Sequence, residues 1–306
     1  MLLLDSITKD LTPWKNAFQE HLPANEVVTI DEIKDPTKVL LAVVWQHRKD
    51  LFHKIPNVQL VASLGAGVDH IIHDPLLPEN VSISKVISPL LSIPMANYCI
   101  GAVLHFHKQF DKYGSDKIEK RWHQQFDPER KMTIGILGLG VLGTDLAKKL
   151  IALGFEVHGL SQAKKEIENI ITYSKDEMGV FLSRVNTLIC MLPATGETVG
   201  LINRSLLNRL PKNSFLINVG RGVQQVNEDI LEALNSGQLE GAFLDVFPEE
   251  PLPESSPLWE HPQVFITPHI AVVTKIEAAV PQIIENYKRL KNGRPLVNLI
   301  DRSKGY

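Results

Sequence analysis

Short aliphatic or β-branched runs alternate along this chain with amphipathic segments of helical length. Two of the helical segments, 144–154 and 227–237, end at a glycine, which is a common stop for a helix. Strand–helix–strand repetition of this kind predicts an α/β fold with a doubly wound parallel sheet. The strand candidates include 40–45, 58–63, 132–137, 155–160, 187–192, 214–219 and 264–268.

One segment, residues 95–122, departs from this alternation and is typical of a long helix. Its apolar residues at helical spacing are Ile100, Val103, Leu104, Phe106 and Phe110. A long helix here could link two domains, and its apolar residues could form a dimer interface. An ordinary helix packed in a core is an equally good interpretation.

Composition narrows the classes of protein that fit. With 306 residues, of which 44% are hydrophobic, the chain can form one large or two medium domains. A formal net charge of -3 gives no basic footprint for nucleic acid. Cys99 and Cys190 lie far apart in apolar runs, so we expect buried thiols rather than a disulfide or a metal site. The N-terminal MLLL is too short for a signal peptide, and no stretch approaches a membrane span. We therefore expect a cytoplasmic protein without a membrane partner.

The stretch GILGLGVLG (135–143) contains a glycine pattern between a predicted strand and a predicted helix. In that context Gly138 permits a tight turn, Gly140 lets a pyrophosphate approach the backbone, and Gly143 lets the helix pack closely on the sheet. The phosphates would meet free N–H groups at the start of the helix. The alternative, a tight turn without a ligand, is less consistent with the flanking elements.

The second strand of this unit predicts which dinucleotide binds. NAD sites usually carry Asp or Glu at the end of that strand, but this chain has Ser161 and Gln162 there, followed by Lys164 and Lys165. A hydroxyl and two ammonium groups attract a 2′-phosphate, whereas a carboxylate repels it. The sequence therefore favours NADP(H), with NAD(H) as the alternative. A solvated run of lysines is the competing interpretation.

Three further groups follow strand-like runs in the same half of the chain. Arg221 lies between two glycines, which we expect to let the backbone and a substrate come close. Glu250 lies in LDVFPEEPLP (244–253), and His269 lies in TPHIA (267–271). Arginine can bind a substrate carboxylate bidentately and polarise the neighbouring ketone. A histidine can give the developing alkoxide a proton, while a carboxylate holds the imidazole in place. Each group alone is more often a structural loop or turn residue; their joint occurrence behind a nucleotide motif favours catalysis.

With these motifs together, the chain resembles the D-2-hydroxyacid dehydrogenase family over nearly its whole length. The resemblance rests on the motifs already quoted, on LPATGET (192–198) and on INVGRG (217–222). Within the family, the glyoxylate/hydroxypyruvate reductase A branch is most similar. That closer resemblance rests on VVWQ (43–46), LGAGVDHI (64–71), SPLWEHP (256–262) and DRSKGY (301–306).

The resemblance implies two doubly wound parallel-sheet domains. A Rossmann cofactor domain, 99–270, would be inserted into a flavodoxin-like catalytic domain made of 1–98 and 271–306. It also implies a homodimer formed through the helical region near 95–125.

The resemblance further implies roles for individual residues. Arg221, Glu250 and His269 would be catalytic, and Trp45, Ala66 and Gly67 would bind substrate together with Arg221 and His269. No metal is implied. The cofactor contacts would come from Gly138, Gly140, Val141, Leu142, Gly143, Ser161, Gln162, Lys164, Lys165, Leu192, Pro193, Thr198, Val219, Gly220 and Asp245.

Three positions depart from the family pattern. Asn97 stands where the linking helix commonly has glutamate, and Gln162 and Lys164 stand where the branch commonly has arginines. The sequence and the resemblance together predict NADPH-dependent reduction of small α-keto acids, glyoxylate to glycolate and hydroxypyruvate to D-glycerate. The alternatives are a dehydrogenase of a bulkier D-2-hydroxy acid and a dinucleotide-sensing scaffold without catalysis.

Overall fold

The computed structural model describes residues 1–124, 126–302 and 305. It divides into two compact units, Met1–Leu91 with Val273–Tyr306, and Ser92–Val272. Of the C-terminal DRSKGY motif, Ser303, Lys304 and Tyr306 lie outside the described residues.

The first unit is built on a five-stranded sheet in the order β2-β1-β3-β4-β5, and all its strand pairs are parallel. One face packs against Phe52, Ile55 and Ile71, and the helices α1 and α10 carry buried apolar residues of their own. The strands are β1 Leu2–Ser6, β2 Val27–Thr29, β3 Leu41–Trp45, β4 Leu60–Ser63 and β5 Ser82–Ser84. The helices are α1 Thr12–Gln19, α2 Leu51–Lys54, α3 Asp69–Ile72 and α10 Ile276–Lys291, with 3-10 turns η1 Ala24–Glu26 and η2 Pro36–Lys38.

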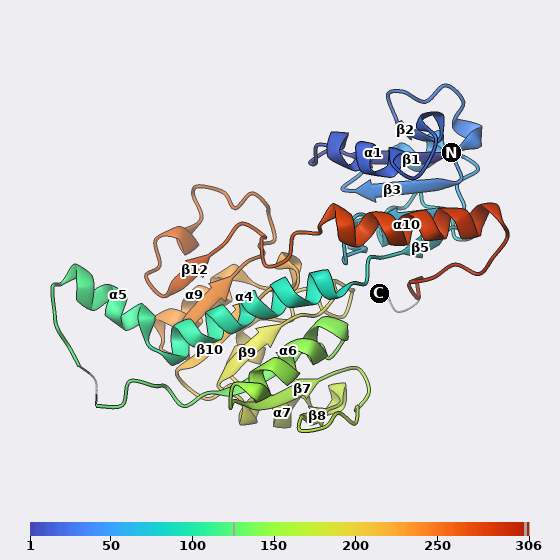
Figure 1. The fold of residues 1–306 in the computed structure, drawn as a ribbon. Helices are drawn as coiled ribbons and strands as arrows, with labels where there is room; N and C mark the ends of the chain where they lie inside the picture. Colours follow the sequence, from blue (N-terminus) through green and yellow to red (C-terminus); the bar gives the residue numbers. More distant parts are fainter. Residues whose placement is uncertain (125, 303–304, 306) are drawn as a thin grey trace. The chain divides into compact units, whose positions relative to one another are not determined.

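The second unit has a seven-stranded sheet in the order β12-β11-β10-β9-β6-β7-β8, again with parallel pairing throughout. The strands are β6 Thr133–Leu137, β7 Glu156–Leu160, β8 Ile171–Tyr173, β9 Thr187–Cys190, β10 Ser214–Asn218, β11 Leu239–Leu244 and β12 Val264–Ile266. The order reverses at β6 and β9, which is where ligands bind in sheets of this kind. The predicted fold class, two doubly wound parallel sheets, is confirmed (Figure 1).

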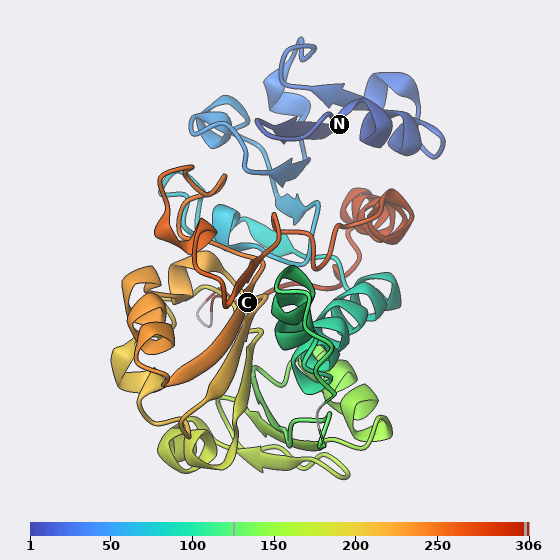
Figure 2. The same cartoon turned by 90° about the vertical axis from the view of Figure 1, so that its left-hand side faces the viewer.

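Helices cover both faces of the second sheet, and each face has its own apolar core (Figure 2). Residues of α4 and α6 fill one core, while α7, α8 and α9 contribute to the other. The helices are α4 Pro89–His107, α5 Phe110–Ile118, α6 Val141–Ala152, α7 Met178–Arg184, α8 Arg204–Leu207 and α9 Asn227–Asn235, with 3-10 turns η3 Lys175–Glu177, η4 Gly222–Gln224 and η5 Pro257–Trp259. As predicted, α6 and α9 stop just before glycines with positive φ, Gly154 and Gly237.

The strands expected from apolar runs are present, and each is shorter than expected by one or two residues. The structure adds β1, β2, β5, β8 and β11, which are absent from the strand candidates. Three of these five strands have only three residues, which is too short for an alternating or continuous apolar pattern to stand out.

The single helix expected over 95–122 is wrong. Helix α4 begins earlier, at Pro89, and ends at His107, and α5 follows after Gln109, whose φ is 58°. The break turns Phe110 outward, so it is exposed, whereas Val103 and Phe106 stay in the core. Residues 119–122, the last part of the expected helix, are not helical.

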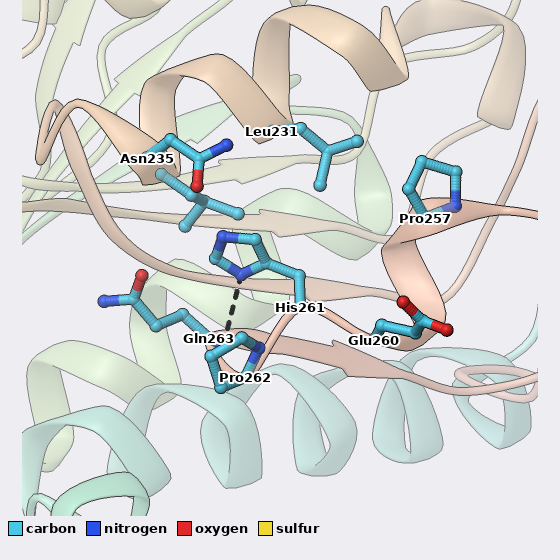
Figure 3. Close-up of a pocket in the computed structure, with 8 residues that line it drawn as sticks. Leu231, Asn235, Pro257, Glu260, His261, Pro262 and Gln263 are labelled. Carbon is cyan, nitrogen blue, oxygen red and sulfur yellow. Dashed lines mark hydrogen bonds between the residues drawn. The ribbon is translucent and has the colours of Figure 1, made fainter.

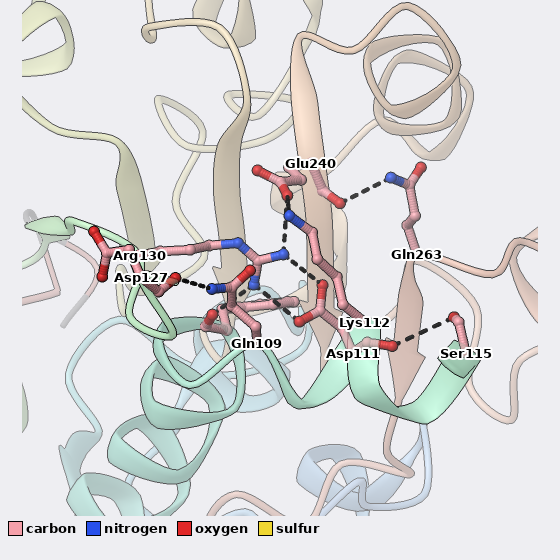
Figure 4. A network of polar contacts seen from close by, with 9 residues as sticks. Gln109, Asp111, Lys112, Ser115, Asp127, Arg130, Glu240 and Gln263 are labelled. Atoms are coloured by element: carbon pink, nitrogen blue, oxygen red, sulfur yellow. Dashed lines mark hydrogen bonds and ion pairs between the residues drawn. The ribbon is translucent and has the colours of Figure 1, made fainter. Parts of the chain in front are cut away.

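A group of ionic and polar contacts fixes this break to the sheet (Figure 4). The Arg130 guanidinium binds both carboxylate oxygens of Asp111, at 2.9 and 2.8 Å, and one of Glu240 in β11. It also donates to the Phe106 carbonyl and lies over the Phe215 ring. Because Arg130 bonds to residues of α4, α5 and β11 at once, it holds the start of α5 in place next to β11.

Helix α4 bears on the expectation that no stretch approaches a membrane span. Among the described residues, it is the one helix long and apolar enough, by length and composition, to cross a membrane. Its apolar residues have another role, since Met95, Ala96, Cys99, Val103 and Phe106 are buried in the core of the second unit.

Candidate functional site

The glycine-rich turn joins β6 to α6. Gly138 has φ of 108°, which favours glycine, and a Cβ there would lie 3.0 Å from the Met191 carbonyl oxygen. A Cβ at Gly143 would overlap the carbonyl oxygen of Gly138, so the helix packs directly on the turn. Gly140, which precedes α6, has no heavy atom near its missing side chain. The turn therefore leaves open space at Gly140, while Val141 and Leu142 begin the helix.

The loop after β7 carries the residues expected to recognise a 2′-phosphate. The Ser161 hydroxyl is mostly buried and donates to the Ala163 carbonyl at 2.8 Å, whereas Gln162 is exposed. Lys164 pairs with Glu177, with Nζ and Oε1 3.6 Å apart. Lys165 donates at 2.6 Å to the carbonyl of Leu139, inside the glycine-rich turn. The two lysines thus differ: Lys165 lies at the turn and Lys164 faces a carboxylate.

The loop after β9 carries the next expected contacts. Thr198 donates to the Pro193 carbonyl at 2.8 Å and accepts from the Thr195 amide, which closes the turn. Gln224, fully buried, donates to the carbonyls of both Leu192 and Pro193 at 2.9 Å. Its amide oxygen accepts from the Arg221 amide at 2.9 Å. Gln224 is absent from the sequence predictions, although its place three residues after the arginine is visible in GRGVQQ.

The glycines beside Arg221 have a different explanation from the expected one. We predict from sequence that they let a substrate approach the backbone. In the structure, a Cβ at Gly222 would overlap the Phe247 backbone, and a Cβ at Gly220 would overlap the Gln224 amide oxygen. The chain's own packing therefore requires both glycines. Val219, just before them, is buried, and its amide donates to the Cys190 carbonyl.

Glu250 and His269 form a pair. His269 Nδ1 lies 2.7 Å from Oε2 of Glu250, and the other oxygen, Oε1, accepts from the Phe247 amide at 2.9 Å. Burial would raise the pKa of Glu250, but the hydrogen bonds from His269 and Phe247, with the charge of Arg221, lower it below its ordinary value. A carboxylate at Nδ1 keeps the proton on that atom, which leaves Nε2 for chemistry.

Asp245 holds the loop that carries His269. Its carboxylate is buried and accepts from the Thr267 hydroxyl at 2.6 Å and from the amides of Ile270 and Ala271 at 2.8 and 2.9 Å. Burial raises the pKa of Asp245, although these hydrogen bonds oppose the rise. The hydroxyl of Tyr98 in α4 lies 2.5 Å from the Thr267 hydroxyl oxygen. Because the Thr267 hydroxyl donates to Asp245, Tyr98 is the donor in this hydrogen bond. His269 itself has φ of 55°, a conformation that this loop imposes.

The residues expected to bind substrate in the first unit lie around the end of β3 and the turn after β4. The Trp45 ring packs against Gly65 and against the His70 ring, with centroids 4.8 Å apart. In the turn 65–67, the amides of Ala66 and Gly67 donate to no acceptor in the part of the chain that the structure describes. They are therefore available to a ligand.

A pocket in the second unit lies apart from all these residues (Figure 3). It is lined by residues of α9 and of the segment from η5 to β12, and His261 accepts there from the Gln263 amide. None of the sequence-predicted site residues lines it. Among the described residues, no group of three His, Cys, Asp or Glu side chains could hold a metal ion.

Comparison with known proteins identifies the family. Residues 100–271 match the family model described as "D-isomer specific 2-hydroxyacid dehydrogenase, NAD binding domain". The chain belongs to the D-isomer specific 2-hydroxyacid dehydrogenase family. The predicted resemblance is thereby confirmed, and the chain is an oxidoreductase of that class.

Named relatives and solved structures agree with that assignment. A protein of Escherichia fergusonii named glyoxylate/hydroxypyruvate reductase A is 39% identical, over 98% of this chain and 97% of that one. A family member from Xanthobacter autotrophicus Py2, solved with NADPH and MES, has a TM-score of 0.93 at 35% identity, covering 100% of this chain and 99% of that one. The NADPH-dependent glyoxylate/hydroxypyruvate reductase of Sinorhizobium meliloti, solved with NADP and sulfate, gives the same TM-score, identity and coverage.

The Glu250–His269 pair predicts a pH-dependent contribution to stability. Since the folded pKa of Glu250 is lowered, its ionised form stabilises the fold above the ordinary glutamate pKa of ~4.3, and this stabilisation is lost as the pH falls through the folded pKa. Glu250→Gln should therefore lower the midpoint of thermal unfolding at pH 7. The difference in midpoint between the two proteins should become smaller as the pH falls toward the pKa of Glu250 in the folded protein. Calorimetry of both proteins at several pH values measures this. A difference that stays constant across the range would contradict it.

Proposed function

We propose that this protein reduces small α-keto acids with NADPH, glyoxylate to glycolate and hydroxypyruvate to D-glycerate. The observation that carries the proposal is the hydrogen-bonded Glu250–His269 pair, with the positive charge of Arg221 close enough to lower the pKa of Glu250. The names of the E. fergusonii and S. meliloti relatives point to the same substrates.

In this mechanism the nicotinamide, when bound, supplies the hydride for the carbonyl carbon. Arg221 binds the substrate carboxylate and draws electron density from the ketone oxygen. His269 donates the proton from Nε2 to that oxygen, so the ketone becomes a hydroxyl group. Glu250 keeps Nδ1 protonated and stabilises the charged imidazole before the transfer. The amides of Ala66 and Gly67 and the ring of Trp45 complete the substrate contacts that we propose.

The residues around the glycine-rich turn fit an NADP(H) cofactor. Gly140 leaves open space before α6, where diphosphate oxygens can meet helix amides. No carboxylate directly follows β7. Lys164 and Lys165 line a surface depression together with Thr172, and Glu166 and Glu168 also line it. Two structural relatives at 35% identity were solved with NADPH or NADP. The remaining proposed contacts are Leu192, Pro193, Thr198, Val219, Gly220 and Asp245.

A direct test measures initial rates with glyoxylate and with hydroxypyruvate. We expect turnover of both, and we expect His269→Ala to lower the rate by roughly 10²–10⁴ because the proton donor is lost. Arg221→Ala should lower kcat/KM strongly, whereas Arg204→Ala, which removes an exposed arginine paired with Glu232, should have little effect. Wild-type turnover of bulkier keto acids alone would redirect the proposal to those substrates. Dinucleotide binding without any turnover would favour the scaffold.

Cofactor choice is tested with the two lysines as a matched pair. Lys165→Ala should raise the KM for NADPH about tenfold, as expected for one lost charge-assisted hydrogen bond, and should leave the KM for NADH nearly unchanged. Lys164→Ala should act less, because that lysine already faces Glu177. Titrating NADPH and NADH side by side gives both values. If Lys165→Ala raises the KM of both cofactors equally, the lysine does not read the 2′-phosphate.

We also propose that two copies associate through the region 95–125. Ile118 and Trp122 are exposed apolar residues at the end of α5 and beyond it. Sedimentation velocity should show a dimer, and Ile118→Glu with Trp122→Glu should shift it to monomer. Val180→Glu, a charge added to an exposed apolar residue of α7, is the control and should leave the dimer intact. A wild-type monomer at micromolar concentration would reject the interface.

A further inference from the structure

Lys9 lies in the loop that follows β1, and its side chain is partly buried. Two hydrogen bonds hold that loop: the Lys9 amide donates to the Ser6 hydroxyl at 3.1 Å, and the Ile7 amide donates to the Gln46 carbonyl at 3.1 Å. The second bond ties the loop to the end of β3, directly after Trp45. These two bonds hold the backbone that leads to Lys9 next to the end of β3, where Trp45 lies.

The ammonium group of Lys9 lies 5.2 Å from the centroid of the Trp45 ring. Within the described part of the chain, no carboxylate lies within salt-bridge distance of it. Burial lowers the pKa of Lys9, and no anionic neighbour offsets that effect. The cation–π contact with the Trp45 ring compensates for that burial only in part. A partly buried ammonium group without a carboxylate partner is stabilised by a ligand oxygen that accepts its hydrogen bonds.

Trp45 connects Lys9 to the turn with the unused amides. A Cβ at Gly65 would lie 2.6 Å from Cζ3 of Trp45, so the indole presses against the start of that turn. The turn is fixed by Ser63, which donates to the Gly67 carbonyl at 2.6 Å and accepts from the Gly65 amide at 3.1 Å. Lys9 and the turn that carries the amides of Ala66 and Gly67 therefore both lie against the same indole ring.

We propose that Lys9 recognises an oxygen-bearing group on carbon 3 of the substrate, either a hydroxyl or a second carboxylate. The inference rests on the proposed function, in which the turn amides hold the carboxylate on carbon 1. The substrate class that follows is 2-keto acids with a polar or acidic third carbon, in preference to those that end in a methyl group. Glyoxylate has no third carbon, so its reduction does not depend on this contact.

Kinetics with two variants test the proposal. Lys9→Met keeps the aliphatic length over Trp45 and removes the charge, and Lys9→Arg keeps the charge. With Lys9→Met we expect kcat/KM for hydroxypyruvate to fall about tenfold, mostly through KM, while the value for glyoxylate stays within about twofold. Lys9→Arg should retain most of the hydroxypyruvate activity. Equal losses with both substrates, or no loss with either, would overturn the role of Lys9.

A binding experiment separates this inference from the proposed function. Calorimetric titration with tartronate, which carries a second carboxylate, is compared with titration with glycolate in the presence of NADP⁺. Tartronate should bind wild type more tightly than Lys9→Met, with glycolate unaffected. Tartronate that binds both proteins equally, or neither, overturns the inference. If wild type reduces neither keto acid but tartronate binding still depends on Lys9, the proposed function fails and the recognition role stands.

Discussion

The buried carboxylate of Asp245 is the interaction on which the proposed catalytic geometry depends. It follows β11 directly, and three donors from residues 267–271 converge on its two oxygens. These bonds shape a loop in which His269 takes a left-handed backbone conformation that a histidine seldom adopts by itself. Without the carboxylate, the loop would lose the contacts that direct His269 toward Glu250. A position that we assigned from sequence to the cofactor thus has a structural task as well.

Close approach between backbone segments is the second constraint. At Gly143 and Gly222 the neighbouring backbone occupies the place of a side chain, so the helix α6 and the arginine loop are each held by direct backbone contact. Such contacts leave little freedom for the loops to rearrange. The residues proposed for the site therefore lie on rigid loops. The first unit offers the unpaired turn amides of Ala66 and Gly67, and the second offers open space at Gly140.

The sequence was sufficient for the fold class because the strands of the second sheet are continuous apolar runs, the pattern that burial on both faces produces. It was also sufficient for the family, whose motifs follow those strands. It was insufficient for the end of α4, since the break at Gln109 depends on Arg130, a residue 21 positions later. Contacts between segments far apart in the chain leave no local pattern.

The same limit applies to residues that act by holding others. Gln224 and Ser63 carry no chemistry of their own, and each is recognised only from the partners that the fold brings to it. The difference between Lys164 and Lys165 is of this kind too, because adjacent lysines in a sequence are alike until one meets Glu177 and the other meets Leu139.

Gln224 has a consequence for how the two ends of the reaction communicate. One side-chain amide joins the carbonyls of Leu192 and Pro193 to the backbone of Arg221, and it is wholly shielded from water. Gln224 thus links the loop of Leu192 and Pro193 to the loop of Arg221, and neither loop can move relative to the other without breaking buried hydrogen bonds. If the cofactor binds against the loop of Leu192 and Pro193, as proposed, it would also restrain the loop of Arg221. On the proposed function, a bound cofactor would thereby position Arg221 for the substrate, which would favour binding of the cofactor before the substrate.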